Sequence, residues 1–365
     1  MLKQYKPTLD KLTKIVGKSH VLIDEQDTRH YRQGIRFGEG KVLAVVCPGT
    51  LLEQWQALQT IIEADCVVIM QAANTGLTGG STPYGDEYDR PVIIMSTRRL
   101  QGIQVILDGK QVVCLPGATL DNLERTLKPY NREPHSVIGS SCIGASVLGG
   151  VCNNSGGALV RRGPAYTEMA LYARVNESGE LELINHLGID LGNTAEEILT
   201  RLQKQDYKMG QITTQTTQLA SDNRYAHDVK QVDADSPARF NADPTRLYEA
   251  SGSAGKVCVF AVRLDTFEKV ESKVFYIGSN DHDDLTAIRR YLLTSLPSLP
   301  IAGEYIHRDA FSIGAKYGKD TFLFIERFGT VNIPRALALK DRIDGWLEKI
   351  KIRGLTDQIL QAITF

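Results

Sequence analysis

The chain has 365 residues, of which 42% are hydrophobic and 23% are charged, and its net charge at pH 7 is −1. This balance is typical of a globular protein with a buried core, and the length predicts two domains or one large domain with an appendage. A net charge so close to zero gives no reason to expect nucleic acid as a partner. The first residues lack the apolar core of a signal peptide, and no later stretch is long and apolar enough to span a bilayer.

Helical and strand patterns alternate through the first third of the chain. Residues 1–35 predict a helix, with Leu9, Leu12 and Val16 at helical spacing, and then a polar connector. The apolar run VLAVVCPG predicts a strand from residue 42, and TLLEQWQALQTIIEAD predicts the helix that follows it. Three further strands are expected, at residues 66–74, 91–97 and 111–120.

The middle of the chain predicts a capped helix and a hairpin. Residues 119–130 predict a helix, with Thr119 as its cap and Asp121 in its first turn. The run LYARVNESGELELIN predicts a β-hairpin that turns at Ser178-Gly179. Residues 194–240 are polar and charged, so we expect one helix and a long surface loop there.

Strand patterns return near the C-terminal third. Residues 256–267 and 273–279 predict strands, and residues 281–297 predict a helix. From Pro300 the pattern is less regular, with amphipathic stretches between residues 333 and 353. The whole is expected to be α+β, with a change of domain near residue 265.

The cysteines point to no metal and no disulfide framework. They lie far apart in apolar or small-residue settings, without CxxC or His-rich spacing, so we expect reduced and mostly buried thiols. The six are Cys47, Cys66, Cys114, Cys142, Cys152 and Cys258.

Residues 139–157 read GSSCIGASVLGGVCNNSGG, with six glycines and no charge. Six glycines and a closing Asn-Asn-Ser make a bilayer helix a poor interpretation. A flexible linker would lack core-like residues such as Val147, Leu148 and Val151. The remaining interpretation is a backbone that approaches another group very closely, which glycine allows because it has no Cβ.

A second glycine-rich stretch, QAANTGLTGGST at residues 71–82, directly follows a predicted strand. Its turns would point several backbone N–H groups in one direction, which is an arrangement that binds anionic oxygens. Alone it could equally be a flexible surface turn, but two such segments at strand ends favour a cofactor that carries a diphosphate. Neither contains the GxGxxG of a Rossmann site, and GSAGK at residues 252–256 lacks the spacing and the Ser or Thr of a P-loop.

Long stretches of the sequence resemble the vanillyl-alcohol-oxidase-type (PCMH) FAD-binding flavoproteins, and within them the group of bacterial respiratory quinone-dependent D-lactate dehydrogenases. The resemblance is carried first by MQAANTGLTGGSTPYGDEYDRPVIIMSTRRL and REPHSVIGSSCIGASVLGGVCNNSGGALVRRGPAYTEMALYARVN. It continues in the same order through HLGIDLGNTAEEIL, ADSPARFNADPTRLYEASGSAGKVCVFAVRLDTF and LPIAGEYIHRDAFSIGAKYGKDTFL.

This resemblance implies a PCMH-type fold in which two α+β subdomains hold FAD between them. It assigns residues 1–264 to that domain, residues 265–306 to the first part of a substrate cap and residues 307–365 to the start of a membrane-binding region. The enzymes that the chain resembles continue well beyond the position of Phe365, so we expect a C-terminally truncated chain.

The resemblance also names the residues expected to contact FAD. Most of them have small side chains or none, as the close approach of a flavin ring and a diphosphate requires. They are Ala72, Ala73, Asn74, Thr75, Gly76, Gly80 and Ser81 in the first segment, Gly139, Ser146 and Gly156 in the second, and Val259 in a later strand. No His or Cys lies in a flavin-linking motif, so the FAD is expected to be bound non-covalently.

The implied reaction is the oxidation of D-lactate, or a similar small D-2-hydroxy acid, with electrons passed to a membrane quinone. His307 lies in a His-Arg-Asp run that is interpreted as a strand, and it is the expected base. His135 is more often a structural hydrogen-bonding residue than a substrate contact. The arginine pairs at 98–99 and 161–162 are interpreted as surface or ion-pairing residues. One alternative is a D-2-hydroxyglutarate or glycolate-type flavin dehydrogenase. Another is a non-catalytic FAD-binding fragment that needs a partner chain.

The C-terminal region predicts a membrane contact. Residues 307–365 carry ten Lys/Arg and seven Asp/Glu, a net charge of +3. Ile343, Trp346, Leu347 and Ile350 recur at helical spacing among Lys349, Lys351 and Arg353. Such a helix can rest on an anionic bilayer or pack Trp346 into a core. The resemblance favours peripheral attachment, on the cytoplasmic side of the bacterial inner membrane.

Overall fold

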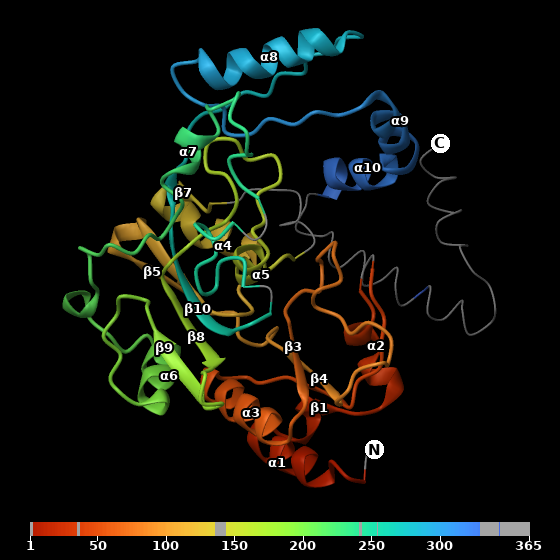
Figure 1. Cartoon of the computed structure of the whole chain (residues 1–365), viewed down its shortest axis with the longest axis vertical. Helices are drawn as coiled ribbons and strands as arrows, with labels where there is room; N and C mark the ends of the chain where they lie inside the picture. The colour runs from red at the N-terminus through yellow and green to blue at the C-terminus, as the bar shows by residue number, and fades with distance from the viewer. Residues whose placement is uncertain are drawn as a thin grey trace. The chain divides into compact units, whose positions relative to one another are not determined.

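The computed structural model describes residues 3–34, 37–135, 144–240, 243–253 and 255–328, together with Ile343. The chain divides into two compact units, one made of Met1–Ile138 with Ala145–Ala302 and the other of Gly139–Gly144 with Gly303–Phe365. The domain boundaries expected at residues 264 and 306 stay a prediction. All described elements from helix α1 to helix α8 belong to the first unit, whose described strands form a four-stranded, a five-stranded and a two-stranded sheet (Figure 1).

The first sheet has the strand order β1-β2-β4-β3. Strands β2 (Ala44–Val46), β4 (Val92–Ser96) and β3 (Val67–Gln71) run parallel, and β1 (Val21–Leu22) is antiparallel to β2. Every residue of β2 and β4 is buried, as continuous apolar runs predict for a parallel sheet covered on both faces. The carboxyl ends of the three parallel strands therefore lie at one edge, where ligands of such sheets commonly bind.

Three helices accompany this sheet. Helix α3 (Leu51–Glu63) begins at Thr50, whose hydroxyl accepts the N–H of Glu53. Helix α1 (Lys6–Val16) packs on α3 through its apolar stripe, and α2 (Glu25–Arg32) contacts β2. The helices expected at the N-terminus and after residue 50 are thus confirmed.

The second sheet is antiparallel, with the order β5-β6-β10-β8-β9. Its hairpin of β8 (Ala170–Val175) and β9 (Leu181–Asn185) confirms the predicted turn at Ser178-Gly179. Strands β6 (Gln111–Cys114) and β10 (Cys258–Asp265) confirm two further predictions. Strand β5 (Ile103–Ile106) was not predicted, because four residues between turns give too short a pattern.

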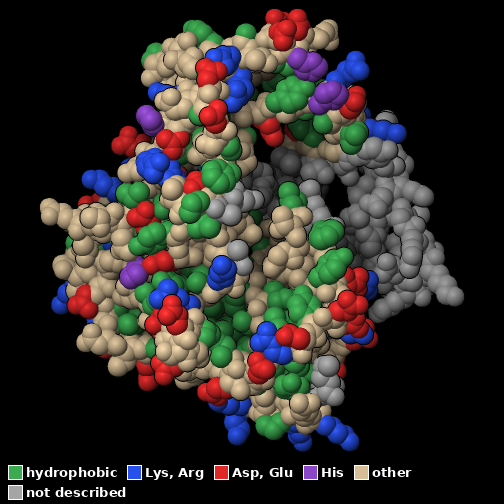
Figure 2. Space-filling model, viewed as in Figure 1, with side chains coloured by type: hydrophobic (Ala, Val, Ile, Leu, Met, Phe, Trp, Pro, Cys, Tyr) green, Lys and Arg blue, Asp and Glu red, His purple; other side chains and the backbone are tan. Residues whose placement is uncertain are grey.

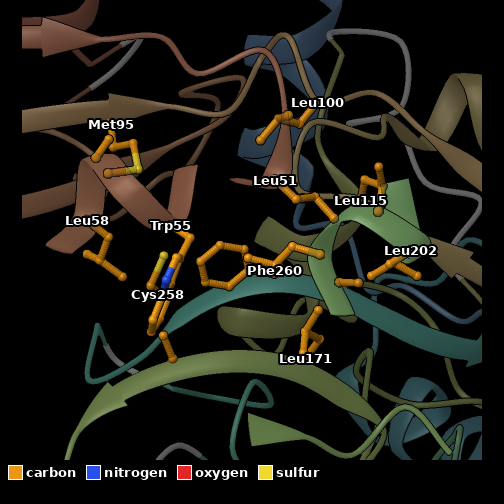
Figure 3. Packing of buried hydrophobic residues seen from close by; sticks show 14 of the residues in the cluster. Leu51, Trp55, Leu58, Met95, Leu100, Leu115, Leu171, Leu202, Cys258 and Phe260 are labelled. Atoms are coloured by element: carbon orange, nitrogen blue, oxygen red, sulfur yellow. The ribbon is translucent and has the colours of Figure 1, made fainter. Parts of the chain in front are cut away.

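Helix α3 fills the space between the two sheets (Figure 3). The ring of Trp55 on α3 lies 6.2 Å from that of Phe260 on β10, and both belong to one buried cluster. A bulge between Val259 and Ala261 turns Phe260 and Ala261 toward α3. Val259 belongs to the buried cluster on the opposite face of the second sheet. That other face carries α4 (Leu120–Leu127), with the predicted Thr119 cap, and α5 (Val147–Cys152).

Shorter elements complete the described chain. Strand β7 (Arg132–Glu133) pairs with β11 (Phe267–Glu268), and α6 (Ala195–Lys204) packs on α3. Helix α7 (Tyr225–Asp228) is short, and α8 (His282–Thr294) confirms the helix expected at 281–297. The described residues also include the 3₁₀ turns η1 (Lys18–His20), η2 (Leu107–Gly109), η3 (Lys128–Tyr130) and η5 (Met209–Gln211). The second unit contains α9 (Arg308–Tyr317) and α10 (Lys319–Phe328).

Two predictions of strands were wrong. Residues 273–279 form no strand, and Val274 and Tyr276 are each 87% exposed, because the described chain offers this apolar run no partner strand. Residues 307–309 do not lie on a strand either: they begin α9, with His307 as its N-cap. The amphipathic stretches predicted between 333 and 353 lie outside the described residues, apart from Ile343.

No helix in the described part of the chain is long and apolar enough to cross a membrane. Lys and Arg side chains are interspersed with Asp and Glu over the face shown in Figure 2. The visible surface of the described residues therefore carries no extended field of one sign.

Candidate functional site

The first glycine-rich segment forms a loop at the carboxyl end of β3. Gln71, which is 2% exposed, donates from its side-chain amide to the carbonyls of Tyr31 (2.9 Å) and Ser81 (2.6 Å). The contact with Ser81 ties the end of the loop back to its beginning. The predicted contacts Ala72, Ala73 and Thr75 are half-buried along the loop between these anchors.

Asn74 fixes the conformation of this loop. Its φ is +56°, a left-handed value that Asn tolerates better than most residues. Its side-chain nitrogen donates to the carbonyl of Gln33 (2.8 Å), and its side-chain oxygen accepts from the Ser81 hydroxyl (2.8 Å). Asn74 and Ser81, both predicted as cofactor contacts, are therefore in contact with each other.

Gly76 and Gly80 of the loop leave open space beside the backbone. A Cβ placed on Gly76 would meet no atom within 4 Å, and one on Gly80 would meet only the Thr78 hydroxyl at 3.8 Å. Neither glycine is required by the packing of the chain itself. A diphosphate or another part of FAD can approach such an open backbone closely. A Cβ at either glycine would keep the cofactor away.

The second segment is built differently. Ser146 is buried and caps α5, where its hydroxyl accepts the N–H of Gly149 at 3.1 Å. A Cβ on Gly156 would lie 2.8 Å from the Cα of Pro164, so the packing of the chain already requires glycine there. Gly139, the third residue predicted in this segment, lies outside the described residues.

A hydrogen-bonded path joins the two segments across the junction of the sheets. The N–H of Thr97 donates to the carbonyl of Gln71 (2.8 Å), and the Thr97 hydroxyl donates to that of Pro116 (3.2 Å). Two residues further on, the carbonyl of Ala118 accepts the N–H of Val147, the first residue of α5 (2.9 Å). The structure thus connects the loop after β3 with the start of α5, although they are about seventy residues apart in sequence.

Val259, the last predicted contact, lies on β10 opposite Tyr172 and packs in the same cluster as α5. Its carbonyl accepts from the buried side chain of Gln54 on α3 (3.3 Å). Of the arginines near the loop, Arg99 donates to the carbonyl of Cys47 (2.7 Å), which is a structural contact, and Arg98 is exposed.

His135 and Arg162 form a buried structural pair. Burial lowers the pKa of His135 to about 4, so its ring is neutral at physiological pH, and Nε2 lies 3.3 Å from the carbonyl of Arg162. The guanidinium of Arg162 pairs with Glu133 and lies 4.1 Å from the ring centre of Phe267. Arg161 donates to the carbonyl of Leu299 (2.8 Å).

His307, the predicted base, belongs to the second unit. Its ring accepts the N–H of Asp309 at 3.2 Å as the cap of α9, and its side chain is 53% exposed. The role of His307 stays a prediction. Within the described ranges no group of three or more His, Cys, Asp or Glu could hold a metal ion.

A buried charge network that the sequence did not predict lies next to the second segment. Asp222 pairs with Arg239 (3.0 Å) and Arg246 (2.8 Å), and all three side chains are at least 95% buried. Arg239 also donates to Asn154 (2.8 Å), which lies in the small-residue segment with a φ of +50°. Asp222 and Arg239 therefore support the backbone near Gly156 through Asn154. In the sequence this network is visible only as a mixture of Asp and Arg, and the same mixture is typical of a solvated loop.

Two family models match the chain. Residues 42–182 match the FAD binding domain, and residues 274–365 match the model described as D-lactate dehydrogenase, membrane binding. The first range contains every predicted FAD contact except Val259. FAD is therefore the cofactor of this domain, and the open glycine backbone at Gly76 and Gly80 fits it.

Three curated relatives match nearly the whole chain, and each carries the name quinone-dependent D-lactate dehydrogenase. The protein of Haemophilus influenzae is 58% identical over 98% of this chain and 64% of its own length. Those of Escherichia coli K12 and Corynebacterium glutamicum are 55% and 46% identical over 98% and 97% of this chain. The chain spans 64%, 63% and 62% of the three relatives.

Solved structures are similar at a greater distance. The p-cresol methylhydroxylase with substrate bound gives a TM-score of 0.48 at 12% identity, over 73% of this chain and 44% of that chain. An alkyldihydroxyacetonephosphate synthase gives 0.47 at 13%, over 73% of this chain and 41% of that one. Over the part of their length that it spans, the chain is highly similar to quinone-dependent D-lactate dehydrogenases, and the FAD-binding and membrane-binding matches agree with that similarity.

Proposed function

We propose that the protein is an FAD-dependent oxidoreductase that converts D-lactate, or a similar small D-2-hydroxy acid, to the 2-oxo acid and passes the electrons to a quinone. The observation that carries this proposal is the loop after β3, which is anchored at Gln71 and Asn74 and open at Gly76 and Gly80. The FAD-binding match and the names of the three relatives support it.

In this proposal the chain holds the cofactor mainly through backbone and small side chains. The loop from Ala72 to Ser81 holds the diphosphate, while Ser146, Gly156, Gly139 and Val259 lie along the rest of the cofactor. FAD held by these residues would supply the redox chemistry, as the acceptor of two electrons from the substrate. His307 takes the proton of the substrate hydroxyl, a role for which imidazole is suited.

We further propose peripheral attachment to an anionic membrane surface, on the cytoplasmic side of the inner membrane. The match of residues 274–365 to a membrane-binding model supports the attachment. The net charge of +3 over residues 307–365 favours an anionic surface.

The test is anaerobic reduction of the bound flavin. The purified chain should be yellow, heat should release all of its flavin into the supernatant, and D-lactate should bleach the flavin absorbance while L-lactate does not. Reduction of dichlorophenolindophenol should then follow D-lactate. Bleaching by D-2-hydroxyglutarate or glycolate instead would identify the related dehydrogenases, and a yellow protein that none of these acids bleaches would be a non-catalytic FAD-binding fragment.

A further inference from the structure

Two aromatic side chains beside the glycine-rich loop are exposed rather than buried. Phe37 is 55% exposed and Tyr84 is 74% exposed, yet their rings stack on each other with centroids 6.4 Å apart and planes inclined by 24°. Large apolar side chains that gather at the surface commonly mark a binding site. These two come from different segments, one before β2 and one after the loop.

The position of the pair is fixed against the loop that is proposed to bind FAD. A Cβ on Gly79 would lie 2.9 Å from the ring of Phe37, so the ring lies directly on the loop backbone. The turn that carries Phe37 is joined to the loop by the Gln33–Asn74 hydrogen bond, and Tyr84 donates its N–H to the hydroxyl of Tyr88 (2.9 Å). The rings are therefore held in place without being covered.

An open hollow of about 510 Å³ lies at this pair. It is lined by Gln33, Gly34, Phe37, Gly38, Glu39 and Tyr84. The side-chain amide of Gln33 gives one N–H to Glu39 (2.8 Å), and an amide nitrogen carries a second N–H that can reach a ligand. Glu39 is the only acidic residue in the lining, and its charge disfavours an anionic ligand.

We propose that this hollow binds the ring of the quinone that accepts the electrons, an inference that rests on the function proposed above. A quinone ring is flat, uncharged and apolar, and it can stack on aromatic side chains in an offset arrangement. Its carbonyl oxygens can accept hydrogen bonds from the Gln33 amide and the Tyr84 hydroxyl. Through the ring of Phe37, the hollow adjoins the backbone of the loop at Gly79, in the part of the proposed FAD site that holds the diphosphate.

Direct binding tests the site without depending on turnover. Ubiquinone-1 is titrated into the purified, FAD-loaded chain, and its dissociation constant is measured by equilibrium dialysis. Changing Phe37→Ala and Tyr84→Ala together should raise that constant at least about tenfold, because both stacking surfaces are lost. The conservative changes Phe37→Tyr and Tyr84→Phe should retain most of the affinity. Tyr291→Ala, at a side chain 58% exposed on α8, is the matched control and should change nothing.

The proposal would be overturned if ubiquinone-1 did not bind the wild-type chain, or if its dissociation constant were unchanged in the double variant. Loss of FAD from the double variant would also overturn it, because the rings would then belong to the cofactor site. If the double variant does not fold, Tyr84→Ala alone carries the test. Anaerobic bleaching by D-lactate, measured before any quinone is added, tests the proposed function separately.

Discussion

The side chain of Asn74 connects two segments that are forty-one residues apart, by donating to the carbonyl of Gln33 at 2.8 Å. Asn74 makes this contact from a left-handed backbone conformation while it also accepts from Ser81. One residue therefore sets both the curvature of the glycine-rich loop and its distance from the turn that carries Phe37.

Asn74→Ala should weaken FAD binding. The change removes two hydrogen bonds, each worth about 1 kcal/mol, and puts alanine where φ is +56°. We expect FAD to dissociate at least about tenfold more readily, which fluorescence of the released flavin would measure. Asn131→Ala is the matched control, since Asn131 has a φ of +50° in a turn near α4. Equal loss of FAD from both variants would show that backbone strain, and not the Asn74 contacts, is responsible.

Gly76→Val should reduce FAD occupancy and leave the fold of the apoprotein intact. A Cβ at Gly76 meets no atom of the chain within 4 Å, so the clash arises only with a bound cofactor. Flavin absorbance relative to protein gives the occupancy, and far-UV circular dichroism reports the fold. Gly210→Val, at a glycine that also has open space, serves as the control. Full occupancy in Gly76→Val would show that the loop is an ordinary surface turn.

His135 should make the protein less stable as the pH falls. Burial lowers its pKa to about 4, below the usual value of 6.5, so the unfolded chain binds the proton first. The free energy of unfolding should therefore decrease between pH 6.5 and pH 4, by on the order of 3 kcal/mol from this group. In His135→Gln this part of the slope should disappear, as urea denaturation at several pH values would show. His282→Gln, at an exposed position, should keep the wild-type slope; an unchanged slope in His135→Gln contradicts the assignment.

Arg239→Met should destabilise the protein strongly. It leaves Asp222 in a buried site with one cation fewer and removes the hydrogen bond to Asn154. Breaking a buried pair in this way costs about 3 kcal/mol or more, whereas an exposed pair contributes about 0.5 kcal/mol. Arg125→Met, which breaks the exposed pair with Asp121, is therefore the control. Chemical denaturation compares the two, and similar losses would mean that the buried network contributes little.

Membrane binding should depend on salt and on lipid charge. The chain should sediment with anionic vesicles at low salt, detach as salt is raised and ignore neutral vesicles, because each basic residue contributes about 1 kcal/mol near such a surface. Lys349→Glu with Lys351→Glu should weaken this binding. Lys14→Glu with Lys18→Glu, at exposed positions near the N-terminus, should not. Equal binding to neutral vesicles would contradict an electrostatic attachment.

Local patterns in the sequence were sufficient for most of the helices and strands. The stripe of α3, the Thr119 cap of α4 and the hairpin of β8 and β9 each depend on residues close together in the chain, so their patterns could be read directly. The glycine-rich loop could also be predicted, because glycines directly after a strand indicate a turn from neighbouring residues alone. The identity of its ligand came from the resemblance of long stretches to a family, and not from the glycines alone.

The tertiary structure decided what depends on distant partners. A strand exists only where another strand pairs with it, so β5 formed from a weak pattern while the stronger one at 273–279 stayed exposed. The same reason explains Asp222 and Arg239, which look like residues of a solvated loop until folding buries them together against Asn154. Phe37 and Tyr84 likewise become one surface only because the chain returns to the same loop.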